Sequence, residues 1–537
     1  MNSTAKKTIA LNCSSKSENN NFQLGVIRRF YIFVVIISCL VQGIFFLGQP
    51  DNLLTSLIAL VASLAAIQYS LHIERVASNP ISTLMILSFN FVSISGALIF
   101  KTLSFSALVE YLVNPAATFT ALATVQIALI LAHILYRKLS IARMIKNWLS
   151  SRIFHRLKVF DQPTNAQLWM MGAIGFMAVM ANAKTYTNGL DANIGLKLLP
   201  GLNFLMLAPF LIPFMPYLNK NIRDRKQHLI PIIIYFMCLI VLGFMTNTRS
   251  IFFNAIATPG AILFLLVVTG KIQVRSSILI KATVVFLVAI PLVYILTDIA
   301  TAMVMVRGVR ADVTGNELIC LTWEALLDKD ALNTFKAASN VILTGDYNEV
   351  YLNNPLLERL IVTKYLDNMF YYSHDFSNSD ITELWKFFGE KIIAIFPQPI
   401  IDLLGFDFDK KIVGTSTGTY IYYLATGNGY GEYMLGSMVA QGFVLMGFLF
   451  PLALMGLAIV IFTVYDAFAA QKSTGILIIS PLILIQSWSL FGATAGATFG
   501  AESISNMIDG LIRGVPQMVL IYFVVFKISR IGRLGFG

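Results

Sequence analysis

The feature that most constrains this chain is a series of apolar stretches, each close to 20 residues long, that begins near Phe30. A stretch of that length spans the hydrocarbon core of a bilayer as one helix. Because lipid offers the backbone no hydrogen-bond partners, such a segment must satisfy its own polar groups, as a helix does. The 537 residues are 57% hydrophobic and only 12% charged, about half the charge of a soluble domain. The sequence therefore predicts an all-α polytopic membrane protein.

We expect about twelve transmembrane helices. Nine precede the one long break between apolar segments, at Phe30–Gly48, Leu53–Leu71, Ile81–Phe100, Ala116–Tyr136, Ala166–Asn182, Leu199–Leu218, Leu229–Met245, Ile251–Thr269 and Ile278–Leu296. Three follow it, at Phe443–Val464, Gly475–Phe491 and Gly514–Phe526. An even number of helices places both termini on the same side of the membrane.

This pattern divides the chain into five parts. They are a polar tail (1–29), a membrane domain of nine helices (30–296), a large cap loop (297–442), a membrane domain of three helices (443–526) and a basic tail (527–537). The first apolar run has no obvious small-residue cleavage site and is soon followed by another. We therefore expect an uncleaved signal anchor rather than a signal peptide.

The distribution of charge orients these parts. The stretch from Asp298 to Glu432 holds 18 of the 28 acidic residues beside 10 Lys/Arg. The segments on the other side of the membrane, which include both tails, hold 24 Lys/Arg and 5 Asp/Glu. Because Lys and Arg accumulate on the cytoplasmic side, we expect cytoplasmic termini and an extracytoplasmic cap loop. The net charge of +11 thus indicates topology, and no nucleic-acid partner is implied.

A basic segment, Arg137–Asn165, separates the fourth and fifth predicted helices. Its apolar residues fall on one helical face and alternate with basic ones. The apolar positions are Ile141, Ile145, Trp148 and Leu149, and the basic positions are Arg143, Lys146, Arg152 and Arg156. The pattern predicts an amphipathic helix on an anionic inner leaflet, and the alternative is a solvated connector.

The cap loop carries its own helix signals. Asn354-Pro355 is a typical start for a helix at Leu356–Tyr371. Asp380-x-x-Glu383 resembles a capping box before a helix at Leu384–Ile395. The stretch Gly405–Gly431 is rich in Gly, Thr, Ser and Tyr, which predicts a mobile segment that orders on binding.

Three arginines are candidates for binding an anion. Arg249 lies in Thr246-Asn-Thr-Arg-Ser250, where two apolar helices meet on the outer side. A guanidinium is costly to keep near a membrane and grips two phosphate oxygens at once, which favours a clamp on a lipid-linked diphosphate. The alternative is an arginine that snorkels to the interface or caps the preceding helix. Arg307 and Arg310, spaced to share a helix face, form a second anion site or a solvated pair that balances the acidic cap.

Two residues are candidates for a general base. His374 is the only one of the five histidines assigned outside, although its surroundings also have the composition of an ordinary polar loop. Glu432 returns the chain to the membrane and is the alternative base, or a group that binds the acceptor. No His/Cys cluster has the spacing of metal ligands, so we expect no metal site.

These motifs carry a family resemblance. The stretch around Arg249 is similar to the Gly-Ser-Arg-type signature of bacterial O-antigen and oligosaccharide repeat-unit polymerases (Wzy-type). The segment from Ile395 to Lys411, followed by Gly431-Glu432 and an apolar helix, resembles the exit of their large loop. This chain departs from the family at Gln398, where an arginine is usual, and after Lys411, where a proline is missing.

The resemblance implies a C-type glycosyltransferase of the bacterial inner membrane that needs neither metal nor cofactor. Undecaprenyl-diphosphate-linked glycans serve such an enzyme as donor and acceptor, within the membrane lipid. Arginines stabilise the leaving diphosphate, and a carboxylate or imidazole takes the proton of the acceptor hydroxyl. A chain-length regulator and a flippase are the further partners that the resemblance implies.

Three other functions stay open. The closest is the sibling O-antigen ligase, in which an extracytoplasmic histidine is expected to be essential. A transporter or flippase is the second, although coupled transporters place acidic residues or paired charges within their helices. A scaffold role in polysaccharide assembly is the third.

Overall fold

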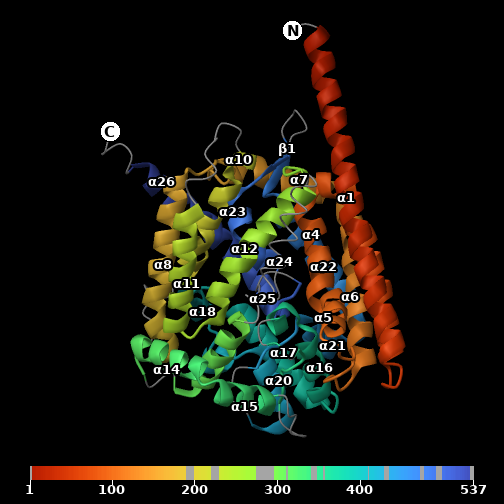
Figure 1. The fold of residues 1–537 in the computed structure, drawn as a ribbon, viewed down its shortest axis with the longest axis vertical. Coiled ribbons are helices and arrows are strands. Elements are labelled where there is room, and N and C mark those ends of the chain that lie inside the picture. Colours follow the sequence, from red (N-terminus) through yellow and green to blue (C-terminus); the bar gives the residue numbers. More distant parts are fainter. Residues whose placement is uncertain are drawn as a thin grey trace.

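The structure of the chain is a computed structural model. Ten of its helical segments coincide with predicted transmembrane helices. Eight are long and apolar enough to cross a membrane, namely Phe22–Phe45, Asn52–Ser70, Pro80–Leu103, Pro115–Lys138, Pro200–Leu218, Arg249–Val268, Met438–Asp466 and Ile504–Ser529. The other two, Asn165–Ala181 and Leu229–Met245, are shorter. Strands are confined to one small hairpin in the described part of the chain. The protein is thus an all-α, multi-pass membrane protein (Figure 1).

The structure describes residues 3–188, 199–218, 229–273, 295–309, 313–339, 347–352, 354, 357–408, 410–428, 434–471, 477–491 and 499–531. Most of the predicted helix Ile278–Leu296 falls outside these ranges, as do Arg310 and Glu432.

The N-terminal membrane region runs from α1 to α12. Its elements are α1 (Ser3–Phe45), α2 (Asn52–Ser70), α3 (Ile73–Ser78), α4 (Pro80–Asn90), the π-helix η1 (Phe91–Ser95), α5 (Gly96–Leu103), α6 (Pro115–Lys138), α7 (Ser140–Trp148), the π-helix η2 (Leu149–Phe154), α8 (Asn165–Asn188), the 3₁₀-helix η3 (Leu199–Phe214), α10 (Met215–Leu218), α11 (Leu229–Met245) and α12 (Arg249–Val268). Pro80 and Pro115 each occupy the first turn of a helix, where a missing N–H is tolerated. A Cβ on Gly175 of α8 would collide with the backbone of Met206 in η3, so glycine permits these two elements to pack closely.

The cap follows residues 295–305, which are helical. It consists of η4 (Val306–Val309), α14 (Gly315–Leu327), α15 (Lys329–Ser339), η5 (Leu357–Leu360), α16 (Thr363–Tyr372), α17 (Asn378–Ile393), α18 (Gln398–Leu403), α19 (Lys410–Gly414) and α20 (Thr417–Thr426). These helices gather at one end of the molecule, opposite the end where both chain termini lie (Figure 1).

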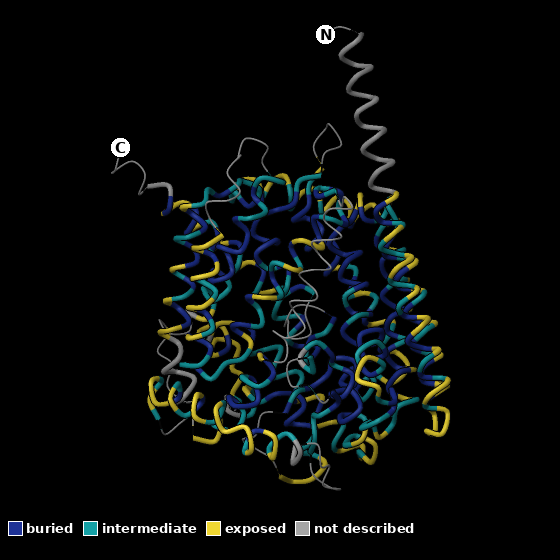
Figure 2. The backbone as a smooth tube through the Cα atoms, viewed as in Figure 1, coloured by how far each residue is buried: buried dark blue, intermediate teal, exposed yellow. Residues whose placement is uncertain are grey.

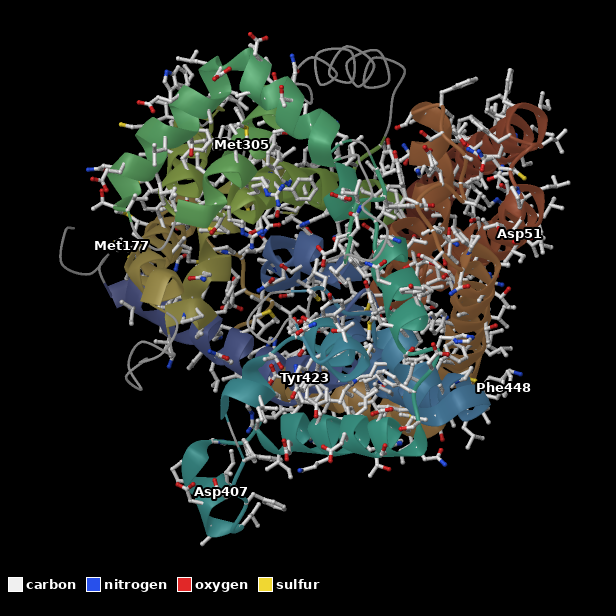
Figure 3. All side chains as sticks on the ribbon, turned by 90° about the horizontal axis from the view of Figure 1, so that it is seen from below. Asp51, Met177, Met305, Asp407, Tyr423 and Phe448 are labelled. Atoms are coloured by element: carbon white, nitrogen blue, oxygen red, sulfur yellow. The ribbon has the colours of Figure 1, made fainter. Side chains whose placement is uncertain are left out.

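The cap helices form two groups. α14 packs against α11, α15 and η4, whereas α16 packs against α6, α20 and α21, and α17 against α20, α21 and α25. Viewed from the cap end, Met305, just before η4, and Tyr423, in α20, lie apart from one another (Figure 3). The predicted helix starts are displaced: α17 begins at Asn378, because Ser377 and Asp380 form the capping box.

The C-terminal region differs from the prediction at one element. It comprises α21 (Met438–Met446), η6 (Gly447–Leu449), α22 (Phe450–Asp466), β1 (Ala469–Gln471), β2 (Leu477–Ile479), α23 (Pro481–Ile485), α24 (Ser487–Phe491), α25 (Ile504–Asp509), the π-helix η7 (Gly510–Gly514) and α26 (Val515–Ile531). The prediction of one helix over Gly475–Phe491 is wrong, because β2 pairs with β1 and Ser480-Pro481 then starts a new, short helix.

Many exposed residues lie on the outer faces of the bundle, while its interior is buried (Figure 2). A large number of these exposed residues are apolar. On α11, for example, Ile230, Ile233, Ile234, Met237 and Val241 are exposed at the spacing of a single helix face. A soluble protein rarely exposes such a surface, and lipid covers it in a membrane.

Candidate functional site

Arg249 is the first residue of α12 and is half-buried. A tight turn joins α11 to α12, with Asn247 in the left-handed region (φ 45°). A Cβ on Gly315, at the start of α14, would lie 3.3 Å from the carbonyl oxygen of Met245, so α14 crosses this turn closely. Arg249 therefore lies where a candidate membrane span meets the cap, as the sequence predicts. The N-terminal end of α12 adds its positive dipole there, which favours an anion.

Arg307 lies in η4 and is exposed. η4 packs against α14, the helix that also covers the α11–α12 turn, so Arg307 belongs to the same group of cap helices. Its predicted partner Arg310 is outside the described residues.

His374 lies on the other group of cap helices, in the turn after α16. Its side chain is 77% exposed, and Nδ1 is 2.7 Å from a carboxylate oxygen of Asp375. None of the contacts described for His374 joins it to Arg249 or Arg307. His374 and Arg307 therefore belong to different groups of cap helices.

Glu432 belongs to residues 429–433, which the structure does not describe. The return segment that follows, Met434–Ser437, is held against the cap on several sides. The Met434 N–H donates to Thr419 Oγ1 at 3.0 Å, and the Leu435 N–H donates to Glu349 Oε1 at 2.8 Å. A Cβ on Gly418 would collide with the Leu435 carbonyl, so only glycine fits beside this backbone.

A tyrosine cluster beside the return segment was not among the predicted site residues. Tyr347, Tyr372 and Tyr422 are in mutual contact, with ring centroids 4.8 to 5.9 Å apart. The Tyr347 hydroxyl donates towards Glu349 Oε1 and the Leu435 carbonyl, both at 3.2 Å, and burial raises its pKa. Tyr371, which is 49% exposed, packs on Tyr372 and extends the cluster to the surface. The runs Phe370-Tyr-Tyr372 and Tyr420-Ile-Tyr-Tyr423 were the signal in the sequence.

A second carboxylate, Glu502, reaches the cap from the C-terminal region. Its Oε1 accepts the Thr417 N–H at 2.7 Å, at the start of α20, whose N-cap is Ser416. Burial lowers the pKa of Lys391 in α17, and the nearby charge of Glu502 opposes that shift. Glu349 therefore holds the return segment, and Glu502 holds the start of α20 beside it.

A cavity of about 410 Å³ lies within the membrane domain, between η3, α12, α24 and the η7–α26 region. Four side-chain amides line it, from Asn203, Asn254, Gln486 and Gln517. Asn254 lies about one and a half turns along α12 from Arg249. Among the described residues, no group of His, Cys, Asp and Glu could hold a metal ion.

Comparisons with protein-family models, curated proteins and solved structures find no match for this chain. A function for it therefore rests on its own residues and their geometry.

Proposed function

We propose that this protein polymerises undecaprenyl-diphosphate-linked oligosaccharide repeat units by glycosyl transfer at the outer face of a bacterial inner membrane. The observation that carries the proposal is the position of Arg249. It begins a candidate membrane span, directly beneath the cap helices. A lipid-linked diphosphate has its phosphates at this level, with its polyprenyl chain in the bilayer and its sugars outside.

The reaction mainly requires positive charge beside the departing diphosphate and a base for the proton of the acceptor hydroxyl. The bond between the anomeric carbon of the donor and its diphosphate oxygen breaks, and the acceptor hydroxyl oxygen bonds to that carbon. Arg249 stabilises the charge that develops on the departing diphosphate, and Arg307 and Arg310 extend the positive region. Glu432 is our choice of base for the hydroxyl proton, because the braced return segment follows it directly. His374 is the alternative base.

The tyrosine cluster supports a glycan substrate. Flat aromatic faces pack against the apolar faces of sugar rings, and tyrosine hydroxyls supply hydrogen bonds at the ring edge. Tyr371 and Tyr423 are exposed on the cap, and Tyr371 packs on the cluster that contacts the return segment. An extended glycan lying across the cap would therefore meet aromatic side chains beside the return segment.

The distribution of Lys and Arg indicates how the protein is oriented in the membrane. The end opposite the cap carries Arg75, Arg137, Lys138, Arg143 and Lys146, and both termini lie there (Figure 1). We assign this end to the cytoplasm, because Lys and Arg mark the cytoplasmic side of membrane proteins. The cap is then extracytoplasmic, where lipid-linked repeat units are joined.

Deletion of the gene, followed by a gel of surface polysaccharide, tests this function. Loss of a polymerase leaves a surface with a single capped repeat unit. Bare core together with accumulated lipid-linked polymer would contradict the proposal and indicate the ligase.

A second assay uses the purified protein in liposomes. Transport of the glycan into the liposomes without any extension would equally contradict the proposal and indicate a flippase.

A further inference from the structure

A second pocket, of about 380 Å³, lies at the end of the molecule opposite the cap. Four elements contribute to it: the α3–α4 turn, the end of α6, α7 and β1. Its lining consists of Ser78, Asn79, Tyr136, Arg137, Arg143, Lys146, Asn147 and Gln471. Three of these residues are cationic and none is acidic. We call it the basic pocket; its volume is in the range of ligand sites.

The cations of the basic pocket are oriented by neutral acceptors. Lys146 Nζ donates to Asn79 Oδ1 at 2.8 Å and to the Ser78 carbonyl at 3.4 Å. Arg143 Nη2 donates to the Arg137 carbonyl at 3.2 Å. In the part of the chain that the structure describes, neither Lys146 nor Arg143 forms an ion pair with a carboxylate. Their charge therefore stays available to an anion.

The floor of the pocket is rigidly held. Asp466, fully buried beneath it, accepts hydrogen bonds from the N–H groups of Ile81 and Ser82, from Ser82 Oγ and from the Tyr136 hydroxyl. These four donors bind its two oxygens. Its charge also attracts Lys146, although the two side chains form no ion pair, so it offsets part of the positive charge of the pocket. The Tyr136 hydroxyl also lies 3.4 Å from Asn79 Oδ1, which links the buried network to Lys146.

An apolar surface borders the basic pocket. Ile141, Met144, Ile145 and Trp148 of α7 are 40% to 64% exposed. They fall at positions i, i+3, i+4 and i+7, which is one face of a helix. α7 follows directly on α6, a candidate span that ends at Lys138. This face therefore lies at the level where membrane-spanning helices end.

A further cavity extends the positive region around the end of α6. It has a volume of about 470 Å³ and is lined by Tyr69, Arg75, Ile134, Arg137 and Lys138. Arg137 lines both cavities, so five cations surround the junction of α6 and α7.

We propose that the basic pocket binds the phosphate of an anionic phospholipid, whose acyl chains lie beside the apolar face of α7. Two features favour this ligand together: oriented cations that outnumber the one buried acid beneath them, and an adjoining apolar face at the ends of the spans. A guanidinium and an ammonium match phosphate oxygens, and basic pockets between transmembrane helices suit anionic headgroups. A soluble phosphate would use the cations but leave the apolar face exposed.

Native mass spectrometry of the full-length protein, titrated in detergent with phosphatidylglycerol or phosphatidylcholine, tests the proposal. We expect the wild-type protein to retain phosphatidylglycerol preferentially. R143Q/K146Q should bind it about thirtyfold more weakly, since each basic residue at an anionic lipid surface contributes about 1 kcal/mol. The matched control R152Q/R156Q removes two exposed charges from the segment just after α7 and should bind as the wild type does. R143K/K146R keeps both charges and should retain most of the affinity.

Three results would overturn the proposal. The first is equal binding of phosphatidylglycerol by R143Q/K146Q and the wild type. The second is a wild-type protein that does not distinguish the two lipids. The third is displacement of bound phosphatidylglycerol by millimolar inorganic phosphate, which would show a site for a free anion instead of a lipid.

Discussion

The carboxylate of Glu349 accepts a hydrogen bond from the backbone N–H of Leu435 at 2.8 Å, across 86 positions of the sequence. This bond joins residues 347–352 of the cap to the return segment, Met434–Ser437. The same oxygen also accepts from the Tyr347 hydroxyl, so one side chain holds both the return segment and the tyrosine cluster.

Replacing Glu349 by alanine should loosen the return segment and shorten the polymer. Hydrogen bonds to a charged group contribute about 1.5–3 kcal/mol, and the Leu435 N–H would lose its partner. We expect faster amide hydrogen exchange at Leu435 in Glu349→Ala, and a smaller change in Glu349→Gln, which keeps an acceptor oxygen. Unchanged exchange in the alanine variant would show that the return segment is held by other contacts.

The attachment of α15 should depend on pH. Asp298 lies 2.9 Å from Lys329 Nζ and 2.5 Å from Lys336 Nζ. Burial raises its pKa, but the hydrogen bonds from the two lysines outweigh this and hold the pKa below its ordinary value of 3.8. A group with a lowered pKa stabilises the fold above its ordinary pKa, and this contribution is lost as the pH falls through the lowered value.

Thermal unfolding in detergent between pH 7 and pH 3 measures this effect. Wild-type stability should exceed that of Asp298→Asn at neutral pH, and the difference should shrink below about pH 4. Asp407→Asn, a change at an exposed cap carboxylate, is the control and should follow the wild type. A constant difference between wild type and Asp298→Asn across the range would contradict the prediction.

Asp466→Ala should be among the most destabilising substitutions in the chain. It leaves four buried donors, from Ile81, Ser82 and Tyr136, without their acceptor. Each unsatisfied buried group costs about 1–3 kcal/mol, so we expect little folded protein in the membrane. Asp466→Asn keeps one acceptor oxygen and should retain more. Membrane abundance by immunoblot distinguishes the two, and normal abundance of the alanine variant would refute the prediction.

Aromatic stacking predicts different outcomes for two substitutions of Tyr371. Tyr371→Ala removes the exposed ring and should lower polymerisation by up to about tenfold, since an aromatic contact contributes about 0.5–1.5 kcal/mol. Tyr371→Phe keeps the ring and should stay close to the wild type. The gel ladder of surface polysaccharide, at matched protein amounts, measures both. Equal loss in the two variants would point to the hydroxyl instead.

The sequence predicted the membrane helices well because the length of an apolar run is a local property. Helix starts were less accurate: Asp380-x-x-Glu383 and Ser377-x-x-Asp380 both resemble capping boxes, and the structure uses the second. α20 was missed because the residues around it are rich in Gly, Thr and Ser, a composition that predicts a loop. Ser416 nevertheless caps it, and Thr417–Ile421 are buried by neighbouring elements, which composition does not reveal.

The sequence predicted only the part of the candidate site that is formed by neighbouring segments of the chain. The junction of two apolar helices located Arg249, since both helices are adjacent in the sequence. Glu349, Tyr347 and Glu502 act through partners more than 80 positions away, and no local pattern reports such contacts. The tyrosine runs were visible, but only the fold brings Tyr347, Tyr372 and Tyr422 into one cluster.

Purified protein in liposomes, supplied with undecaprenyl-diphosphate-linked repeat units, tests the polymerase function and the role of Arg249 together. We expect the wild type to form a ladder of extended lipid-linked glycans. Arg249→Ala should slow extension on the order of a hundredfold, the loss of about 3 kcal/mol of transition-state stabilisation. Arg249→Lys should recover little, because an ammonium lacks the planar fork. No extension by the wild type, or a near-normal ladder from an equal amount of the alanine variant, would contradict the proposal.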